Sequence, residues 1–103
     1  MLDSAREALE FGAGRASHDL ALDRMRSLAI VRCIEIIGEA ASKIGPETRT
    51  AHPEIPWIDI VGMRNRLVHA YFDIDLERVR DTIAIDLPPL VQALEQILAE
   101  RVR

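Results

Sequence analysis

The sequence predicts an all-α fold, a four- to five-helix bundle, and three observations support this prediction. The chain has 103 residues, of which 49% are hydrophobic and only 4% aromatic. Its core must therefore be built from Leu, Ile, Val and Ala, which suits packed helices. Apolar residues recur at steps of three and four, the spacing of one helix face. No stretch alternates convincingly as strands do, and the length predicts a single domain over residues 1–103.

Two helices are predicted in the N-terminal half. Ser4 and Glu7 have the spacing of a capping box, which predicts a first helix over residues 4–11. Glycines follow it, and a long helix is then predicted over residues 19–44. The main apolar stripe of this helix is Ile30, Cys33, Ile34, Ile37, Ala41 and Ile44. A second apolar set lies off that stripe, at Leu28, Ala29, Val31, Ile36 and Ala40. The long helix is therefore either central in the fold or also faces a partner chain.

A loop and a third helix come next. Gly45 followed by Pro46 is typical of a helix end. Residues 46–55 are predicted to be a loop, with one helical turn within it as an alternative. Pro56 suits the first turn of a third helix over residues 57–71.

The C-terminal segment predicts further helix. Asp73 or Asp75 is placed to cap a helix that runs to Ile85, and Asp86 is placed to cap the last helix. The apolar positions of the two segments keep the same phase. One kinked helix is therefore an alternative to two separate ones.

Composition narrows the function classes. The net charge is -4, which argues against a general nucleic-acid binder with a broad basic surface but leaves a local basic pocket open. Cys33 is the single cysteine, so neither an intramolecular disulfide nor a Cys-x-x-Cys metal site is possible, and we interpret it as a core residue. The acidic N-terminus does not resemble a signal peptide, and no stretch approaches the roughly 20 apolar residues that span a bilayer. We expect a soluble, cytoplasmic protein without membrane contact.

One stretch concentrates chemically active side chains: GMRNRLVHAYF, residues 62–72. On a continuous helix, Tyr71 would lie about 20° from Arg64, whereas Asn65 and His69 would lie about 100° and 140° round from it, and Arg66 about 200°. Arg64 and His69 would then not share a face. A common site would require a distorted helix end, a long reach by the arginine, or a second copy of the chain.

These side chains suit RNA cleavage without a metal or other cofactor. An imidazole in general titrates near neutral pH, so His69 is a candidate general base or acid. The guanidinium of Arg64 can stabilise charge that builds on phosphoryl oxygens. Asn65 can orient the histidine or the phosphate, Arg66 is a weaker candidate RNA contact, and Tyr71 supplies a hydroxyl that can carry a modification. The alternative is a solvated polar face, which residue types alone favour.

A metal site has little support. The chain contains no His-Glu-x-x-His or Cys-x-x-Cys motif. Glu35 and Glu39 form an i,i+4 carboxylate pair on the long helix, but such a pair usually faces solvent. We therefore expect no metal ligands.

The stretch RNRLVH, extended to Arg-x4-His-x-Tyr, resembles the signature of the HEPN superfamily and of its HepT-like toxins. Further segments agree in order and spacing: IEIIGEAASKI at 34–44, HPEIPWIDIVGMRN at 52–65, HAYFDIDLERV at 69–79 and DLPPL at 86–90. The resemblance covers roughly residues 20–100.

This resemblance implies a HEPN-like helical homodimer whose two motif copies face a shared cleft. It implies a metal-independent endoribonuclease, the toxin of a type VII-like toxin–antitoxin pair, with Arg64 and His69 as catalytic pair and Asn65 beside them. It also implies that a minimal nucleotidyltransferase (MNT) antitoxin silences the enzyme by attaching AMP to Tyr71. The alternative function is a non-catalytic helical dimer that binds a nucleotide, an RNA or the nucleotidyltransferase.

Overall fold

The computed structural model describes the backbone of residues 1–69 and 73–102; of these, the side chains of residues 17, 18, 68, 69, 73, 101 and 102 are not described. The described chain is predominantly helical and confirms the predicted all-α bundle. The principal extents are 44 × 27 × 18 Å. The helices are α1 (Leu2–Gly12), α2 (Ser17–Ala21), α3 (Arg24–Ser42), α4 (Pro46–Ala51), α5 (Trp57–Val61), α6 (Met63–Leu67), α7 (Leu76–Asp81) and α8 (Leu87–Val102), with a π-helical segment, η2 (Thr82–Asp86).

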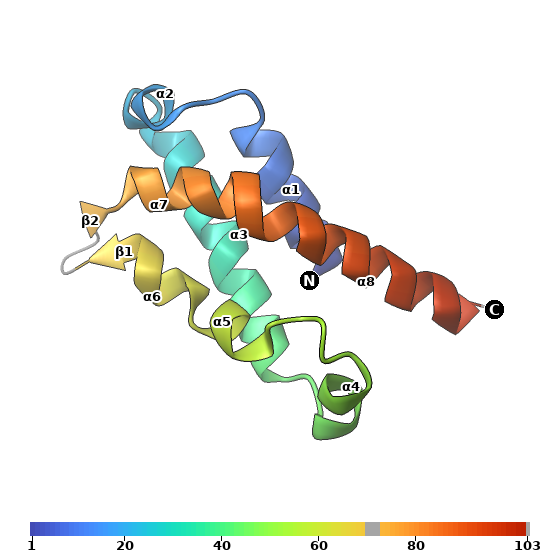
Figure 1. Cartoon of the computed structure of the whole chain (residues 1–103). Coiled ribbons are helices and arrows are strands. Elements are labelled where there is room, and N and C mark those ends of the chain that lie inside the picture. The colour runs from blue at the N-terminus through green and yellow to red at the C-terminus, as the bar shows by residue number, and fades with distance from the viewer. Residues whose placement is uncertain (70–72, 103) are drawn as a thin grey trace.

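Helix α3 is the central element of the fold (Figure 1). It packs against α1 on one side and against α5 and α6 on another, while α7, η2 and α8 form one rod that crosses it. Its inward side is apolar and buried, at Ile30, Val31, Cys33, Ile34, Ile37 and Ala41. The predicted stripe is thus confirmed from Ile30 to Ala41, because those side chains form the centre of the core.

The first two predicted helices differ from the observed ones at their ends. Helix α1 begins at Leu2 with Met1 at its N-cap, so the capping box expected from Ser4 is wrong. The predicted long helix is interrupted, because α2 ends at Ala21 and Asp23 caps the start of α3: the Asp23 carboxylate accepts a hydrogen bond from the backbone N–H of Arg26 at 3.0 Å. The first N–H groups of a helix have no partner within that helix, and the capping carboxylate accepts from one of them.

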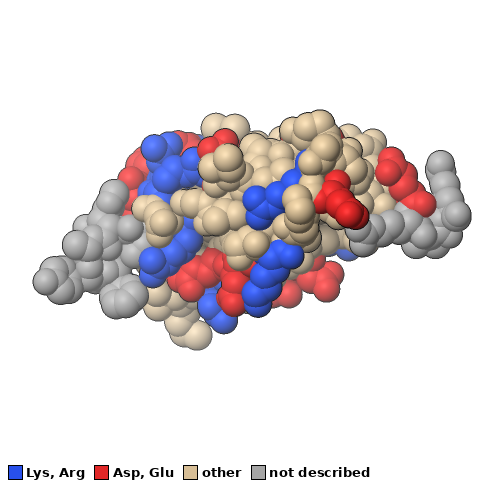
Figure 2. Space-filling model, turned by 90° about the horizontal axis from the view of Figure 1, so that it is seen from below, with Lys and Arg blue, Asp and Glu red and all other residues tan. Residues whose placement is uncertain are grey.

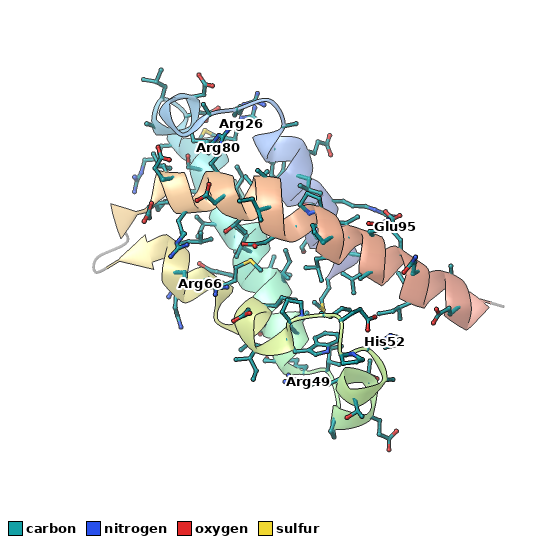
Figure 3. All side chains as sticks on the ribbon, in the orientation of Figure 1. Arg26, Arg49, His52, Arg66, Arg80 and Glu95 are labelled. Carbon is teal, nitrogen blue, oxygen red and sulfur yellow. The ribbon has the colours of Figure 1, made fainter. Side chains whose placement is uncertain are left out.

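The C-terminal end of α3 is held by a side chain from α4. Arg49 donates from Nη2 to the carbonyl of Ala41 at 2.8 Å and from Nε to that of Ile44 at 3.1 Å. Ala41 lies in the last turn of α3 and Ile44 just beyond its end, where a helix leaves carbonyl groups without the full set of helical partners. Arg49 and His52 lie at this end of the molecule (Figure 3).

Gly38 allows α5 to approach α3 closely. A Cβ at this position would lie 3.2 Å from the carbonyl oxygen of Ile60 and 3.3 Å from that of Val61. The absence of a side chain therefore brings the two backbones together. This contact places α6, which follows α5, along the side of α3.

The predicted third helix, residues 57–71, is wrong in its second half. It divides at Gly62 into α5 and α6, and helix ends at Leu67. The chain then forms β1 (Val68–His69), which pairs antiparallel with β2 (Asp73–Ile74), Val68 opposite Ile74 and His69 opposite Asp73. The sequence predicted no strand here, because a two-residue pair has too few positions for an alternating pattern.

The C-terminal rod confirms the single-helix alternative. Asp75 caps α7 as predicted, accepting the N–H of Arg78 at 3.1 Å. Asp86 caps no new helix, because the chain continues through η2 into α8, where Leu87 donates to the carbonyl of Thr82, a five-residue step. Pro88 and Pro89 provide no N–H and crowd the preceding turn, which favours this wider turn.

Candidate functional site

Helix α6 presents three consecutive polar side chains, Arg64, Asn65 and Arg66. It is anchored on either side of them by Met63, 3% exposed, and Leu67, 0% exposed. These two apolar residues are four positions apart and face the core together. The three polar residues between them are consequently directed away from it.

Arg64 turns toward α3. Its Nε donates to Oε1 of Glu35 at 3.4 Å. The other oxygen of Glu35, Oε2, accepts a hydrogen bond from Nη1 of Arg32 at 3.3 Å. The side chains of Arg64 and Glu35 are 40% and 32% exposed, so the pair lies at the surface but is partly shielded. The expectation that the 35/39 carboxylate pair faces solvent holds for Glu39, which is exposed and lies 3.6 Å from Lys43. It fails for Glu35, which contacts the motif arginine.

Arg66 turns the other way, toward α5. Its Nη2 donates to the carbonyl of Asp59 at 2.8 Å, and its Nη1 lies 3.8 Å from the Asp59 carboxylate. Figure 3 labels Arg66 beside α6, near the point where α5 leads into it. The two arginines of the motif are therefore divided between different neighbours.

Asn65 and His69 are placed by backbone structure. The Asn65 side chain is exposed, and its N–H donates to the carbonyl of Gly62 at 3.1 Å. His69 lies on β1. The backbone N–H of Asp75 donates to the carbonyl of Leu67 at 2.7 Å, a contact that joins the residue before β1 to the residue after β2. Tyr71 lies outside the described residues, as does the side chain of His69.

The angles expected for a continuous helix therefore do not apply to His69. The helix ends between Arg64 and His69, as the first of the three expected arrangements requires; a common site for the two side chains stays a prediction. Helical angles therefore do not require a second copy of the chain. Any case for a dimer must come from elsewhere on the surface.

The outward side of α3 supplies such a case. It exposes Met25 (85%), Leu28 (43%) and Ile36 (36%). Leu22 at the end of α2, and Ile58 and Val61 on α5, are also exposed. We call these six exposed apolar residues the outer face. Glu35 and Arg32 belong to the same sector of α3, since helical spacing puts residues 25, 28, 32, 35 and 36 within about 100°. The Arg64–Glu35 pair thus adjoins exposed apolar surface.

A groove of about 500 Å³ lies on the opposite side of α6, between α5–α6 and the α7–η2–α8 rod. Arg66 and Arg78 reach it, but so do four carboxylates, Glu54, Asp59, Asp81 and Asp86. In Figure 2, basic side chains gather on the half of the surface nearer to β1 and β2, with acidic side chains among them. The groove is therefore not a basic channel.

The pKa values of Cys33 and Asp23 are shifted from their ordinary values. Burial raises the pKa of the Cys33 thiol, and the charge of Glu7 adds to this effect. A neutral, buried thiol is a poor nucleophile, so the prediction of a core residue is confirmed. Hydrogen bonds from the backbone and side chain of Arg26 lower the pKa of Asp23.

Residues 1–69 and 73–102 contain no group of three or more His, Cys, Asp or Glu side chains that could hold a metal ion among those described. Within the same part of the chain, no helix is both long and apolar enough to cross a bilayer.

The fold and the site define a small helical protein with an arginine motif at the point where α6 becomes a strand. Comparison with known proteins identifies its family. The family model described as Ribonuclease HepT-like matches residues 1–97. The chain therefore belongs to the HepT-like ribonuclease family, which confirms the resemblance found in its motifs.

Individual relatives agree with this assignment. The chain is 35% identical over 100 residues to "Probable ribonuclease HepT" of Thermococcus cleftensis, a match that covers 93% of this chain and 91% of the relative. It is 34% identical over 98 residues to "Putative RNase TTE0752" of Caldanaerobacter subterraneus, covering 95% of this chain and 88% of the relative. No solved structure matches the chain.

Sequence reasoning missed Glu35 and Arg32 as neighbours of the motif. Glu35 is 29 positions from Arg64, and their contact depends on how closely α5 approaches α3 at Gly38. The i,i+3 spacing of Arg32 and Glu35 in the sequence predicts an ion pair between them. It does not predict that Glu35 also contacts Arg64.

Proposed function

We propose that the protein is a metal-independent endoribonuclease that cleaves cellular RNA with Arg64 and His69. The observation that carries the proposal is the orientation of Arg64: Nε is bonded to Glu35, whereas no described residue bonds to Nη1 or Nη2. A guanidinium with a free fork is suited to the paired oxygens of a phosphate. Membership of a ribonuclease family supports the same activity.

The chemistry requires no group beyond the side chains and the RNA. His69 as general base takes the proton of a ribose 2′-hydroxyl, and the oxygen attacks the adjacent phosphorus. The bond to the 5′-oxygen then breaks, leaving a 2′,3′-cyclic phosphate and a 5′-hydroxyl that takes a proton from a general acid. Arg64 stabilises the charge on the non-bridging oxygens, and Asn65 orients the reacting groups. Arg66 is a weaker candidate contact, because Asp59 already engages it.

The test is RNA cleavage by the purified protein beside Arg64→Ala and His69→Ala. Loss of a stabilising donor typically lowers kcat by roughly 10²–10³-fold. We expect a loss of at least this size for each variant, in the presence of EDTA as well as without it. Identical products at identical rates from all three proteins would show that the activity is a contaminant.

We also propose that two copies of the chain associate through the outer face, as the apolar residues Met25, Leu28 and Ile58 suggest. Exposed apolar patches on a small protein mark interaction surfaces. A homodimer would bring two motifs to one cleft and would shield the Arg64–Glu35 pairs from water. A monomer in sedimentation at micromolar concentration would contradict this assembly.

The proposed regulation is that of the type VII-like toxin–antitoxin arrangement. A cognate minimal nucleotidyltransferase would catalyse attack of the Tyr71 hydroxyl on the α-phosphate of ATP, with release of pyrophosphate. The attached AMP would place negative charge beside the arginine that binds phosphate and would repel RNA. Incubation with that antitoxin and ATP should add one AMP to the intact mass of the wild type but not of Tyr71→Phe.

A second candidate function is a non-catalytic module that binds a nucleotide, an RNA or the nucleotidyltransferase. Two observations favour it: the net charge of -4 and the four carboxylates at the groove, which suit a protein partner better than a polynucleotide. Saturable binding of such a partner without any cleavage of RNA would support this function over the first.

A further inference from the structure

A chain of three charged side chains links α3 to the motif. Arg32 donates to Oε2 of Glu35 at 3.3 Å, and Arg64 donates to Oε1 of the same carboxylate at 3.4 Å. Both oxygens of Glu35 are therefore engaged, each by a different arginine. The first contact joins residues three apart on one helix, whereas the second joins α3 to α6.

These two ion pairs contribute little to the stability of the fold. The side chains of Arg32, Glu35 and Arg64 are 65%, 32% and 40% exposed. Ion pairs with that degree of exposure are weakened by water and salt. The contact is better explained by what it does to the position of Arg64.

The geometry at Arg64 leaves its binding fork free. Glu35 contacts Nε, the nitrogen nearest the main chain, and no described residue bonds to the two terminal nitrogens. An arginine side chain has many rotamers, and fixing one of them costs entropy. A contact at Nε that is present before RNA arrives lowers the cost of holding the guanidinium in the orientation that the transition state requires.

Arg32 completes the arrangement by its charge. Glu35 alone would neutralise Arg64 and weaken its attraction for phosphate. With Arg32 on the other oxygen, the three side chains together carry one positive charge. Glu35 can then hold Arg64 without cancelling the charge on which phosphate binding depends.

We propose that Glu35 is a positioning residue, which orients the Arg64 guanidinium toward the scissile phosphate while Arg32 holds the Glu35 carboxylate in place. This inference rests on the proposed ribonuclease function, because it assigns Glu35 a role in that same site.

The kinetic test compares Glu35→Ala and Glu35→Gln with Glu39→Ala. Glu39 is a matched control, since it lies one turn further along α3 and has its own partner, Lys43, at 3.6 Å. Misplacing a reacting group by about 1 Å can cost on the order of 10²-fold in rate. We expect Glu35→Ala to lower kcat by roughly this factor without raising KM, because removing a carboxylate does not weaken attraction for phosphate.

The glutamine variant separates orientation from charge. Gln keeps an acceptor oxygen for Nε of Arg64 but has no charge. We expect its kcat to lie between those of wild type and Glu35→Ala. Equal losses for Gln and Ala, a rise in KM alone, or an equal loss for Glu39→Ala would each overturn the positioning role. The thermal midpoints of the Glu35 variants should stay close to that of wild type, and a large fall would also contradict the proposal.

A measurement independent of cleavage follows the Nε–H resonance of Arg64 by NMR, assigned by its absence in Arg64→Lys. Glu35→Ala should shift this resonance and speed its exchange with water, whereas Glu39→Ala should leave it unchanged. No response to Glu35→Ala would overturn the inference whether or not the protein cleaves RNA. If the wild type shows no cleavage but the resonance responds, the ribonuclease proposal fails while the Glu35–Arg64 contact stands.

Discussion

The two sides of α3 differ in chemistry and in what they contribute. The inward side is apolar except for Ser27 and is closely packed, with Ile34 and Ile37 completely buried. The outward side mixes exposed apolar side chains such as Met25 with the charged residues Arg32 and Glu35. One helix therefore supports the core on one side and the functional motif on the other.

The difference shows why the site is built at the edge of the core and not inside it. An arginine that is to bind phosphate must keep its charge in contact with solvent or ligand, since isolated buried charge is costly. Glu35 lies on α3 where the buried sector meets the exposed one. It can therefore engage Arg64 while its own helix stays anchored by Ile34 and Ile37.

The largest expected effect on stability is on the inward side, and neighbouring isoleucines provide a matched test. Ile37→Ala removes a side chain that is 0% exposed, so we expect a loss of about 2–5 kcal/mol in the free energy of unfolding. Ile36 lies on the outward side and is 36% exposed. Ile36→Ala should therefore lower the free energy of unfolding of the protomer much less than Ile37→Ala does. Urea denaturation monitored by circular dichroism measures both. Equal costs would mean that the two sides of α3 are not different environments.

A smaller effect is expected where α3 meets α5. Gly38→Ala brings a Cβ to 3.2 Å from the Ile60 carbonyl, and a backbone atom cannot yield without moving its helix. Although alanine is favoured over glycine in helices by about 1 kcal/mol, we expect a net loss of about 1 kcal/mol from this overpacking.

Gly62→Ala is the control for this substitution. The added Cβ would meet only ordinary contacts, the nearest being the Ile58 carbonyl at 3.6 Å, and its stability should be equal to or slightly above wild type. A stabilised Gly38→Ala protein would show that the close approach of α5 to α3 is not rigid.

A pH-dependent effect is expected at the start of α3. The hydrogen bonds from Arg26 lower the pKa of Asp23 in the folded state. A carboxyl group with a lowered folded pKa stabilises the fold above its unfolded pKa, near 3.9, and loses this contribution as the pH falls through the folded value. Asp23→Ala should therefore melt below wild type at pH 7, and the two melting curves should converge below about pH 4. A constant difference across this range would contradict the role of the ionised cap.

The smallest effect on protomer stability is expected on the outer face. Met25→Glu replaces a side chain that is 85% exposed, so the free energy of unfolding of the protomer should change by no more than about 0.5 kcal/mol. Association should weaken, because a charge would enter the proposed contact between copies. Sedimentation of Met25→Glu beside Leu98→Glu, an exposed apolar residue on α8, measures this. If both variants changed the association of copies equally, the contact between copies would not lie on the outer face.

The helices and the core were predictable from the sequence to the extent that periodicity determines them. The Ile30–Ala41 stripe repeats over several turns, and the cap at Asp75 follows local rules. The break at Asp23 was missed, because a mid-chain aspartate fits either a helix or a cap. The π-helical turn before Pro88 and Pro89 was foreseen only as a possible kink.

The candidate site was predictable in its residue types but not in its geometry. Arg64, Asn65 and His69 stand out by spacing and by family resemblance, and their roles stay predictions. The end of α6 at Leu67 was not visible, because Val68 and the residues that follow fit helical periodicity as well as they fit a strand. The contact between Glu35 and Arg64 depends on tertiary packing at Gly38, which no local pattern records.

The most direct test of the central claim is cleavage of an RNA with one 2′-deoxy substitution at the scissile nucleotide, in EDTA, by wild type and His69→Ala. We expect wild type to cleave the all-ribose RNA to a 2′,3′-cyclic phosphate, the deoxy substitution to block that cut, and His69→Ala to abolish it. Cleavage that persists at the deoxy position, or that does not depend on His69, would contradict the proposed mechanism.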